Sequence, residues 1–243
     1  MKQIIQSLIF LLLLGCDNAP QPDIKSPQSE QEKEVINVGF LITDGVYNTE
    51  FTAPWDIFHH TKFRDSITPM QVFSISNQSN PVKTFEEILI HPDYDFTKDG
   101  LPRIDILVVP SAEHHLDTDL EDQPLVDFIK KTGSQAKMVL SLCDGAFMLA
   151  QAGLLDSVAS TTFPSDIPVY REKFSQLEVI DSTLFVHDGK FITSAGGAKS
   201  FEAALYISEY LYGAEVAKRL AKGLVIDWDL SNIPHTIKSP SPF

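Results

Sequence analysis

The chain has 243 residues, a formal net charge of −14 and a hydrophobic share of 43%. This length and apolar share allow one large domain or two small ones with a sizeable core. The negative charge argues against a nucleic-acid partner, because phosphate binding draws its affinity from clustered lysines and arginines. Acidic proteins also repel anionic membranes, so a membrane attachment is expected to be covalent or inserted rather than electrostatic.

The N-terminus has the pattern of an export signal. Lys2 supplies a short positive start, and residues 4–14 form an apolar run that is too short to span a bilayer as a helix. The run leads into Leu-Leu-Gly-Cys, which resembles the lipobox of bacterial lipoproteins. The resemblance implies a signal peptide at residues 1–15, diacylation of Cys16, and attachment to the lipid bilayer of the bacterial cell envelope with the domain outside the cytoplasm. An uncleaved or ordinary secretory peptide is the alternative.

Residues 16–34 are predicted to be the acylated cysteine and a flexible tether, because they are rich in proline, glutamine, serine and charge and have no hydrophobic period. A folded domain is expected at 35–230, followed by a proline-rich tail at 231–243. With Cys16 acylated, Cys143 is the only thiol left in an exported protein and has no partner for an intramolecular disulfide. It is therefore either buried and inert or functional.

Short apolar runs alternate with helical patterns along the domain, as in proteins that bury parallel strands on both faces. Thr52 and Pro54 mark the start of the first helix, and Asp122 and Gly133 mark the two ends of the second. In chain order, the predicted elements are a strand at 35–42, a helix at 53–60, strands at 70–76 and 104–109, a helix at 122–133, a strand at 138–142, a helix that begins at 146–150, a hairpin at 184–193 with an Asp-Gly turn, a helix at 199–212 and a shorter helix after Gly213. This alternation predicts an α/β fold with a single mostly parallel sheet and helices on both faces.

The most informative segment is Val-Leu-Ser-Leu-Cys-Asp-Gly-Ala-Phe at 139–147, in which an apolar strand runs directly into Cys143 and then into a helix. This order is typical of a nucleophile elbow, a sharp strand-to-helix turn that pushes the side chain outward. The thiol then lies at a helix N-terminus, which favours a thiolate, and at the carboxyl end of a strand, where open parallel sheets bind ligands. A cysteine buried in the core is the alternative.

Residues 142–155 resemble the elbow of the ThiJ/PfpI superfamily, which has a class I glutamine amidotransferase-like (flavodoxin-like) fold. Within it, the most similar branches are the isocyanide hydratase group and the sensor domains of AraC-type regulators. The similarity spans roughly residues 35–213, and further blocks follow in the same order at 44–58, 106–110, 159–162 and 193–197. The resemblance implies a small-molecule substrate or ligand, and a homodimer, because dimers are frequent in the superfamily.

The resemblance also implies roles for residues around Cys143. Glu50 would hydrogen-bond the cysteine, and a solvated charge at a helix entry is the alternative. The main-chain N–H groups of Ser111 and Ala112 would form an oxyanion site together with that of Asp144. Relatives usually have two glycines at positions 111 and 112, so this loop is expected to be displaced.

Two positions depart from the pattern of the superfamily. Phe163 follows the paired threonines where many relatives have a histidine, and Asp144 stands where other branches have histidine or threonine. A carboxylate beside the thiol raises the pKa of the thiol. Either a carboxyl group therefore keeps a proton and serves as a general acid, or the cysteine is unreactive. Gly196 and Gly197 match the last block and are expected to contribute to the binding site.

His114 and His115 could lie over the mouth of the site or form a solvated loop pair. No third metal ligand is identifiable for them, so no metal site is predicted. No cofactor is predicted either, because neither a Walker loop nor a dinucleotide fingerprint follows a strand. Two functions remain open: a hydratase or hydrolase that uses Cys143 as nucleophile and Glu50 as acid or base, and a non-catalytic ligand-binding or redox-sensing module.

Overall fold

The structure is a computed structural model that describes residues 34–243. The predicted signal peptide, Cys16 and the tether up to residue 33 lie outside the described residues. None of the helices in residues 34–243 is long and apolar enough to cross a membrane. The elements are β1 (Ile36–Leu41), α1 (Asn48–His59), η1 (His60–Phe63), β2 (Met70–Ser76), β3 (Val82–Lys83), β4 (Leu89–Ile90), β5 (Tyr94–Asp95), β6 (Ile106–Val109), η2 (Thr118–Glu121), α2 (Gln123–Gln135), β7 (Met138–Leu142), α3 (Gly145–Gln151), β8 (Ala159–Ser160), η3 (Pro164–Asp166), α4 (Ile167–Lys173), β9 (Glu178–Val179), β10 (Phe185–Gly189), β11 (Phe191–Ser194), η4 (Gly197–Lys199), α5 (Ser200–Tyr212), α6 (Ala214–Gly223), η5 (Leu230–Asn232) and β12 (His235–Pro240).

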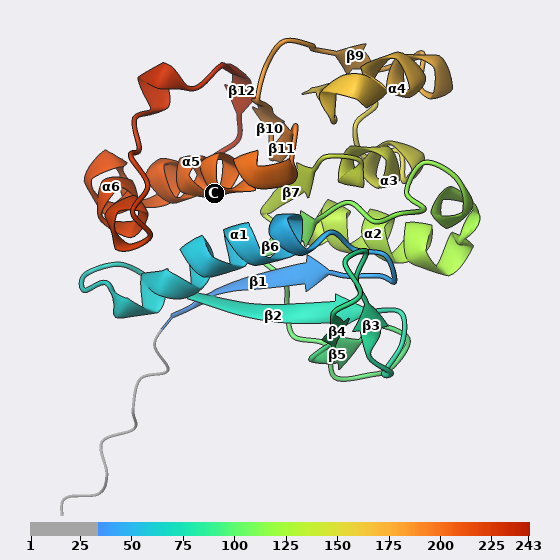
Figure 1. The fold of residues 1–243 in the computed structure, drawn as a ribbon, viewed down its shortest axis with the longest axis horizontal. Helices are drawn as coiled ribbons and strands as arrows, with labels where there is room; N and C mark the ends of the chain where they lie inside the picture. Colours follow the sequence, from blue (N-terminus) through green and yellow to red (C-terminus); the bar gives the residue numbers. More distant parts are fainter. Residues whose placement is uncertain (1–33) are drawn as a thin grey trace, which may run out of the picture. The chain divides into compact units, whose positions relative to one another are not determined.

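An eight-stranded sheet has the order β12-β10-β11-β7-β6-β1-β2-β5 (Figure 1). Its neighbouring strands are all parallel except β10 and β11, which form the predicted hairpin. The prediction of a single, mostly parallel sheet is therefore confirmed. Two short strand pairs, β3-β4 and β8-β9, lie outside this sheet.

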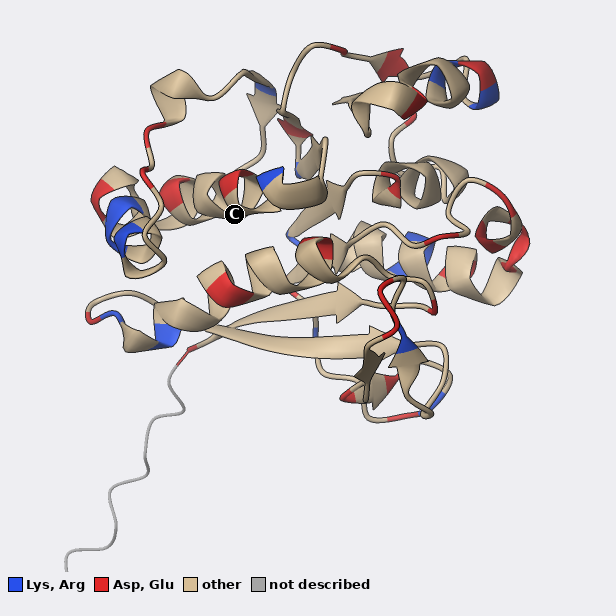
Figure 2. Cartoon of the chain, viewed as in Figure 1, with Lys and Arg blue, Asp and Glu red and all other residues tan. Residues whose placement is uncertain are grey.

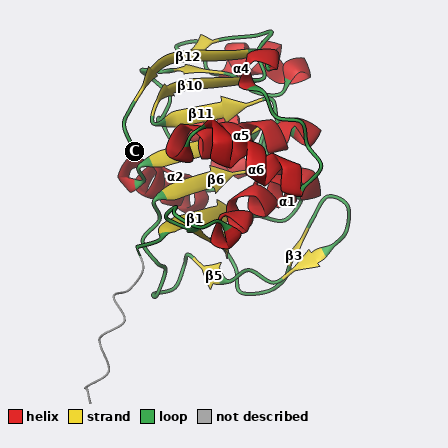
Figure 3. Cartoon of the chain, turned by 90° about the vertical axis from the view of Figure 1, so that its left-hand side faces the viewer, coloured by secondary structure: helices red, strands yellow, loops and turns green. Residues whose placement is uncertain are grey.

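The apolar run of β1 supplies side chains to both faces of the sheet, because successive residues of a strand point to opposite sides. Val38 and Phe40 join the core formed with α1, α5 and α6, whereas Leu41 joins the core formed with α2 and α3. Figure 3 shows α1, α5 and α6 together beside the sheet. The prediction of helices on both faces agrees with these two cores, and the central strands are mostly apolar because both of their faces are covered.

Helix α1 begins at Asn48, five residues before the predicted start, and its N-cap residue Tyr47 makes no side-chain cap. The Asn48 N–H instead donates to Glu86 Oε2 at 3.1 Å, from the loop between β3 and β4. Thr52 is not a cap, since its hydroxyl donates to the Asn48 carbonyl oxygen within the helix at 2.8 Å. Pro54 lies in the helix interior rather than in the first turn. A cap supplied from 38 residues away leaves no local signal in the sequence.

Helix α2 starts as predicted, with Asp122 Oδ1 accepting from the Leu125 N–H at 3.1 Å. Its predicted end at Gly133 is wrong, because the helix continues to Gln135. A Cβ at Gly133 would lie 2.6 Å from Leu154 Cδ1. This glycine therefore allows close packing of α2 against the segment after α3 and does not terminate the helix.

The predicted tail at 231–243 is also wrong in part, because residues 235–240 form β12, an edge strand parallel to β10. The His235 ring stacks on Phe185 with centroids 5.3 Å apart. Proline is compatible with an edge strand, because one side of the strand needs no N–H donors. Pro240, one of the prolines that suggested a tail, is the last residue of this edge strand.

Candidate functional site

Cys143 lies between β7 and α3 in the strained backbone of a nucleophile elbow. Its φ is +50°, a left-handed value that is uncommon for residues other than glycine, and its N–H donates to the Ser194 carbonyl oxygen at 2.8 Å. A Cβ at Gly145 would lie 2.1 Å from the Val109 carbonyl oxygen, so only glycine fits two residues after the cysteine. The predicted elbow is present, and the residue Cys143 is 7% exposed.

Glu50 reaches the elbow from α1 and is buried, so the alternative of a solvated charge is wrong. Its Oε2 accepts from both the N–H and the hydroxyl of Ser111, at 2.9 and 2.8 Å, and its Oε1 accepts from the Gly197 N–H at 2.8 Å. Within residues 34–243 no hydrogen bond joins this carboxylate to the thiol of Cys143, contrary to the implied contact. Glu50 instead links helix α1 to the two loops that carry Ser111 and Gly197.

The predicted oxyanion site needs correction. The N–H of Ser111 is occupied by Glu50 and is not available for a developing oxyanion. Ala112 forms an isolated antiparallel bridge with Val46, which ties this loop to the loop before α1. The hydrogen bonds of this bridge run from the Tyr47 N–H to Ser111 and from the Glu113 N–H to Gly45, so the bridge does not use the N–H of Ala112. Of the three predicted amides, that of Asp144 favours the thiolate form of Cys143 and lowers the pKa of the thiol.

Gly196 and Gly197 lie just after the end of β11, beside Cys143 and Glu50. Gly196 has φ +72°, and a Cβ there would lie 2.5 Å from the Cβ of Cys143 and 2.8 Å from Oε1 of Glu50. No other residue fits between the thiol and the carboxylate. Gly197 donates its N–H to Glu50 and has open space where a Cβ would be. Both glycines therefore act on the cysteine by positioning Glu50 and the elbow.

Asp144 accepts a hydrogen bond from the thiol, with Sγ of Cys143 3.6 Å from Asp144 Oδ2. The hydroxyl of Thr162 lies 3.0 Å from Asp144 Oδ1 and 3.0 Å from the carbonyl oxygen of Cys143. Burial raises the pKa of Asp144 to about 7, with Asp166 and Glu50 adding to the effect and the Thr162 and Cys143 hydrogen bonds opposing it. Asp144 is thus a carboxyl group that exchanges a proton near neutral pH.

The thiol itself is protonated at neutral pH. Burial raises the pKa of Cys143 far above its ordinary value, and the negative charges of Glu50 and Asp144 raise it further. The Ser111 hydroxyl and the Asp144 N–H lower the pKa of the thiol and oppose this shift without cancelling it. The helix N-terminus lowers the pKa of the thiol, but burial and the two carboxylates raise it by more.

The sequence alone assigned no role to two residues of the site, Thr162 and Tyr47. Thr162 lies in a block that resembles the superfamily, but only the structure shows that it orients Asp144. Tyr47 faces the same charges: burial raises its pKa, and so do Cys143, Asp144 and Glu50. Its ring packs on Phe85 with centroids 4.6 Å apart.

The two loop histidines lie outside this constellation. His114 is half-exposed, with Nδ1 3.3 Å from Asp117. His115 is buried, which lowers its pKa to about 3, and its Nε2 is 3.7 Å from Asp119. Within residues 34–243, no group of three or more His, Cys, Asp and Glu side chains could hold a metal ion. Phe163 projects partly into solvent at the position where relatives have a histidine.

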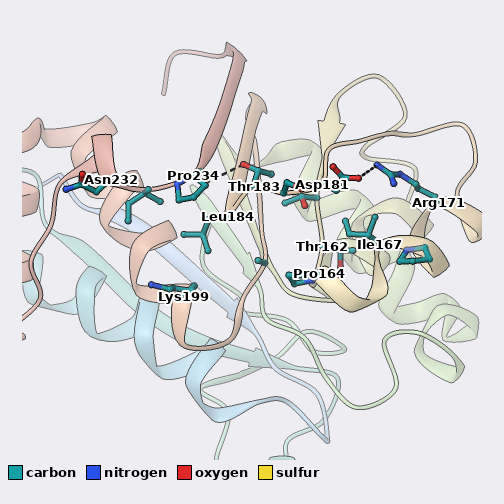
Figure 4. A pocket seen from close by; sticks show the side chains of 15 residues that line it. Thr162, Pro164, Ile167, Arg171, Asp181, Thr183, Leu184, Lys199, Asn232 and Pro234 are labelled. Atoms are coloured by element: carbon teal, nitrogen blue, oxygen red, sulfur yellow. Dashed lines mark hydrogen bonds and ion pairs between the residues drawn. The ribbon is translucent and has the colours of Figure 1, made fainter.

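A pocket of about 660 Å³ adjoins the site (Figure 4). Its lining includes Thr162, whose hydroxyl contacts Asp144, and Ala195, which directly precedes Gly196 in the chain. Arg171, paired with Asp181 at 2.9 Å, and Lys199 bring charge to a lining that is otherwise mostly apolar. Its remaining lining residues are Thr161, Pro164, Ile167, Pro168, Ser182, Thr183, Leu184, Asn232, Ile233 and Pro234.

The sheet order and the cysteine after β7 define a class of flavodoxin-like α/β proteins with a nucleophile elbow. A family model described as the DJ-1/PfpI family matches residues 36–210, and the chain belongs to this family. The resemblance to the ThiJ/PfpI superfamily is confirmed to that extent.

Curated relatives and solved structures agree with this assignment. The chain is 26% identical over 200 residues to protein DJ-1alpha of Drosophila melanogaster, covering 82% of this chain and 88% of that protein. It is 27% identical over 184 residues to isonitrile hydratase of Pseudomonas putida, covering 75% of each. The crystal structure of Drosophila melanogaster DJ-1beta superposes with a TM-score of 0.66 at 24% identity, covering 80% of this chain and 100% of that one. A ThiJ/PfpI family protein from Pseudomonas syringae gives a TM-score of 0.68 at 20% identity, covering 87% and 84%.

Proposed function

We propose that this protein adds water to small carbon electrophiles, as a hydratase or hydrolase, with Cys143 as nucleophile and Asp144 as proton carrier. The observation that carries the proposal is the pairing of the two groups. Sγ of Cys143 is 3.6 Å from Asp144 Oδ2, and the pKa of Asp144 is raised to about 7. A general acid or base works best when its pKa is near the operating pH.

The chemistry can be written for an isonitrile, the substrate class named for the Pseudomonas putida relative. Sγ of Cys143 bonds to the terminal carbon while its proton passes to Asp144, and Asp144 returns that proton to the same carbon. The product is a thioimidate. Water then adds to the carbon and a proton goes to nitrogen. The C–S bond breaks, the thiol regains its proton through Asp144, and an N-substituted formamide leaves.

In this proposal Glu50 positions the loops around Cys143 and does not act as the acid or base that the sequence suggested. Its oxygens accept from Ser111 and Gly197, so both are engaged in holding loops. The pocket beside Thr162 supports a small, partly apolar substrate, since its volume of about 660 Å³ is in the range of ordinary ligand sites.

The second part of the proposal is the location of the protein. The lipobox-like sequence that ends at Cys16 supports acylation, and two or three acyl chains give lasting attachment to a bilayer. We therefore propose that the domain acts at the surface of a membrane of the bacterial cell envelope. Mass spectrometry of the protein from cell membranes tests this directly, because the mature N-terminus would be a diacylated Cys16.

A non-catalytic ligand-binding module is the second candidate. The observation in its favour is the buried thiol with its raised pKa, because the thiolate is the reactive form of cysteine. The same observation disfavours redox sensing, which requires an exposed cysteine of low pKa. Only binding without chemistry therefore remains as the alternative.

The deciding experiment measures formamide production from a panel of alkyl and aryl isonitriles, with Cys143→Ser and Asp144→Asn beside the wild type. We expect turnover by the wild type, none by the serine variant and a loss of about 100-fold or more in Asp144→Asn, which lacks its proton carrier. Intact mass should show the thioimidate on Cys143. Binding of isonitriles without turnover, or turnover that survives in Cys143→Ser, would refute the enzymatic proposal.

A further inference from the structure

One end of the molecule carries cations and exposed apolar side chains that the proposed chemistry does not use. Phe63 is 65% exposed at the end of η1, and Val225 is 96% exposed just after α6. Around them lie Lys62, Arg64, Arg219 and Lys222. Arg64 joins the two segments, since its Nη2 donates to the Arg219 carbonyl oxygen at 3.2 Å. We call Lys62, Phe63, Arg64, Arg219, Lys222 and Val225 the basic end patch, and Figure 2 shows its two segments at the same end of the domain.

The charge of the basic end patch is unusual in a protein of net charge −14. Within residues 34–243, none of its four cations forms an ion pair with a carboxylate, although the neighbouring Lys218 lies 3.7 Å from Glu215. On α6 the apolar residues Val216 and Leu220 face the core, so the lysines and the arginine face outward. Asp65 and Asp227 are close in sequence, so the four cations exceed these two nearby carboxylates in number.

Val225 is in a conformation that its own packing does not explain. Its N–H donates to the Lys222 carbonyl oxygen and the N–H of Ile226 to that of Ala221, the two bonds of a Schellman helix end. Val225 therefore occupies the left-handed position at which glycine is usual, with φ +59°. A β-branched residue is strained there, and nothing in residues 34–243 covers its side chain. An exposed apolar residue kept in a strained position indicates a contact outside the described chain.

The described chain starts beside this patch. Glu34 and Val35 share a surface hollow with Ser66, Ile67 and Thr68, the segment that follows Arg64. The N–H of Ile36 donates to the Pro69 carbonyl oxygen at 3.0 Å. A tether from Cys16 to residue 34 would span at most about 60 Å. Such a tether limits the distance from the bilayer but leaves the orientation of the domain open.

We infer that the basic end patch is the face that docks on an anionic lipid surface, with Phe63 and Val225 entering the headgroup region. The inference rests on the proposed acylation of Cys16, which raises the local concentration of lipid so that a weak contact suffices. Cations attract anionic headgroups and exposed aromatic and aliphatic side chains insert between them. A symmetric contact between two copies is less favourable, because near the two-fold axis it would bring the same cations together. The carboxyl ends of the strands, where Cys143 lies, would then face away from the bilayer.

The test uses the full-length, acylated protein in vesicles of phosphatidylcholine with or without 30% phosphatidylglycerol. A fluorescent label on Val225→Cys reports contact, and the same label on Ile88→Cys, which is exposed on the β3-β4 loop, is the control. Unmodified protein measures background labelling of the buried Cys143. We expect iodide quenching of the label at 225 to fall about threefold or more in anionic vesicles only, while the label at 88 is unchanged.

Charge variants separate this contact from the anchor. The double variant Lys62→Glu/Lys222→Glu should weaken binding of the patch to anionic vesicles at least fivefold for each lysine replaced. The control double variant Lys130→Glu/Lys131→Glu, on the exposed face of α2, should leave this binding unchanged. Val225→Gly should weaken the contact while raising the melting temperature, because it relieves backbone strain. A variant that merely unfolded would lower both the contact with the vesicle and the melting temperature.

Vesicle flotation distinguishes the possible failures. Protein that floats with both lipid mixtures but gives equal quenching at 225 and 88 keeps its anchor and overturns the docking face. Protein that does not float overturns the anchor, and the docking face with it. Shielding at 225 that is independent of lipid and grows with protein concentration would assign the patch to a second copy and also overturn the inference.

Discussion

Replacing Asp144 by asparagine is expected to stabilise the protein above pH 7 while it removes the proposed proton carrier. Burial raises the pKa of Asp144 from 3.8 to about 7, and Asp166 and Glu50 add to the effect. Between these two values the folded state binds more protons than the unfolded state. The contribution of Asp144 to stability is therefore lost as the pH rises from about 4 to 7, and the loss persists above pH 7. The gap between the two pKa values corresponds to about 4 kcal/mol of unfolding free energy as an upper limit.

Urea unfolding at a series of pH values between 4.5 and 8.5 measures this directly. The free energy of unfolding of the wild type should fall with rising pH relative to Asp144→Asn, and the variant should be the more stable protein at pH 8. Asparagine can still accept from the Thr162 hydroxyl, which is 3.0 Å from Asp144 Oδ1. Asp166→Asn serves as the matched control, because removing its charge should shift the wild-type pH dependence to lower pH without abolishing it. An unchanged pH dependence in Asp144→Asn would refute the assignment of the raised pKa to this residue.

Three further outcomes follow from the site and the sheet. Alkylation of Cys143, followed by intact mass, should be slow at pH 7 and accelerate only at alkaline pH. Glu50→Gln should lower the pKa of the thiol, because it removes one of the negative charges that raise it. An unaltered pH profile of alkylation in this variant would contradict the effect of the Glu50 charge. Gly196→Ala should cost about 3 kcal/mol or more in denaturant unfolding, because its Cβ would lie 2.5 Å from that of Cys143. Gly197→Ala, which has open space for a Cβ, should cost only about 1–2 kcal/mol from its positive φ, so equal losses would argue against steric packing at Gly196. Removal of residues 231–243 should destabilise the domain, because β10 loses its hydrogen-bonded neighbour β12. An unchanged melting temperature would show that this edge strand contributes nothing to stability.

The sheet and the elbow could be predicted because they depend on local sequence. Buried parallel strands are apolar on both faces, so β6 is a continuous apolar run, and β1 and β7 are apolar runs interrupted by Asn37 and Ser141. The elbow requires glycine at 145 for a close contact with the Val109 carbonyl oxygen, and this requirement leaves a visible Cys-x-Gly pattern. The resemblance to the superfamily also implied that Glu50 lies near Cys143, but the hydrogen bonds of Glu50 go to Ser111 and Gly197 rather than to the thiol.

The errors arose where a residue from a distant segment determines the local structure. Glu86 accepts from the N–H of Asn48, so α1 starts earlier than its own residues indicate. Leu154 fills the space beside Gly133, and α2 therefore continues through a glycine that resembles a C-cap. The pairing of β12 with β10 similarly converts a proline-rich segment into an edge strand. None of these contacts has a signature in the segment that it reshapes.

The largest discrepancy concerns the oxyanion site, and it bears on which reaction the protein performs. Hydrolysis of an amide or ester builds negative charge on an oxygen in its first step and needs N–H donors aimed at that oxygen. Here the Ser111 N–H is engaged with Glu50 at 2.9 Å, and burial with two carboxylates disfavours further negative charge. Attack on an isonitrile builds charge on the carbon instead, and a proton from Asp144 neutralises it without an oxyanion site. We therefore expect isonitrile hydration to exceed hydrolysis of esters of similar size, and the reverse order would point to a hydrolase that finds its oxyanion donors elsewhere.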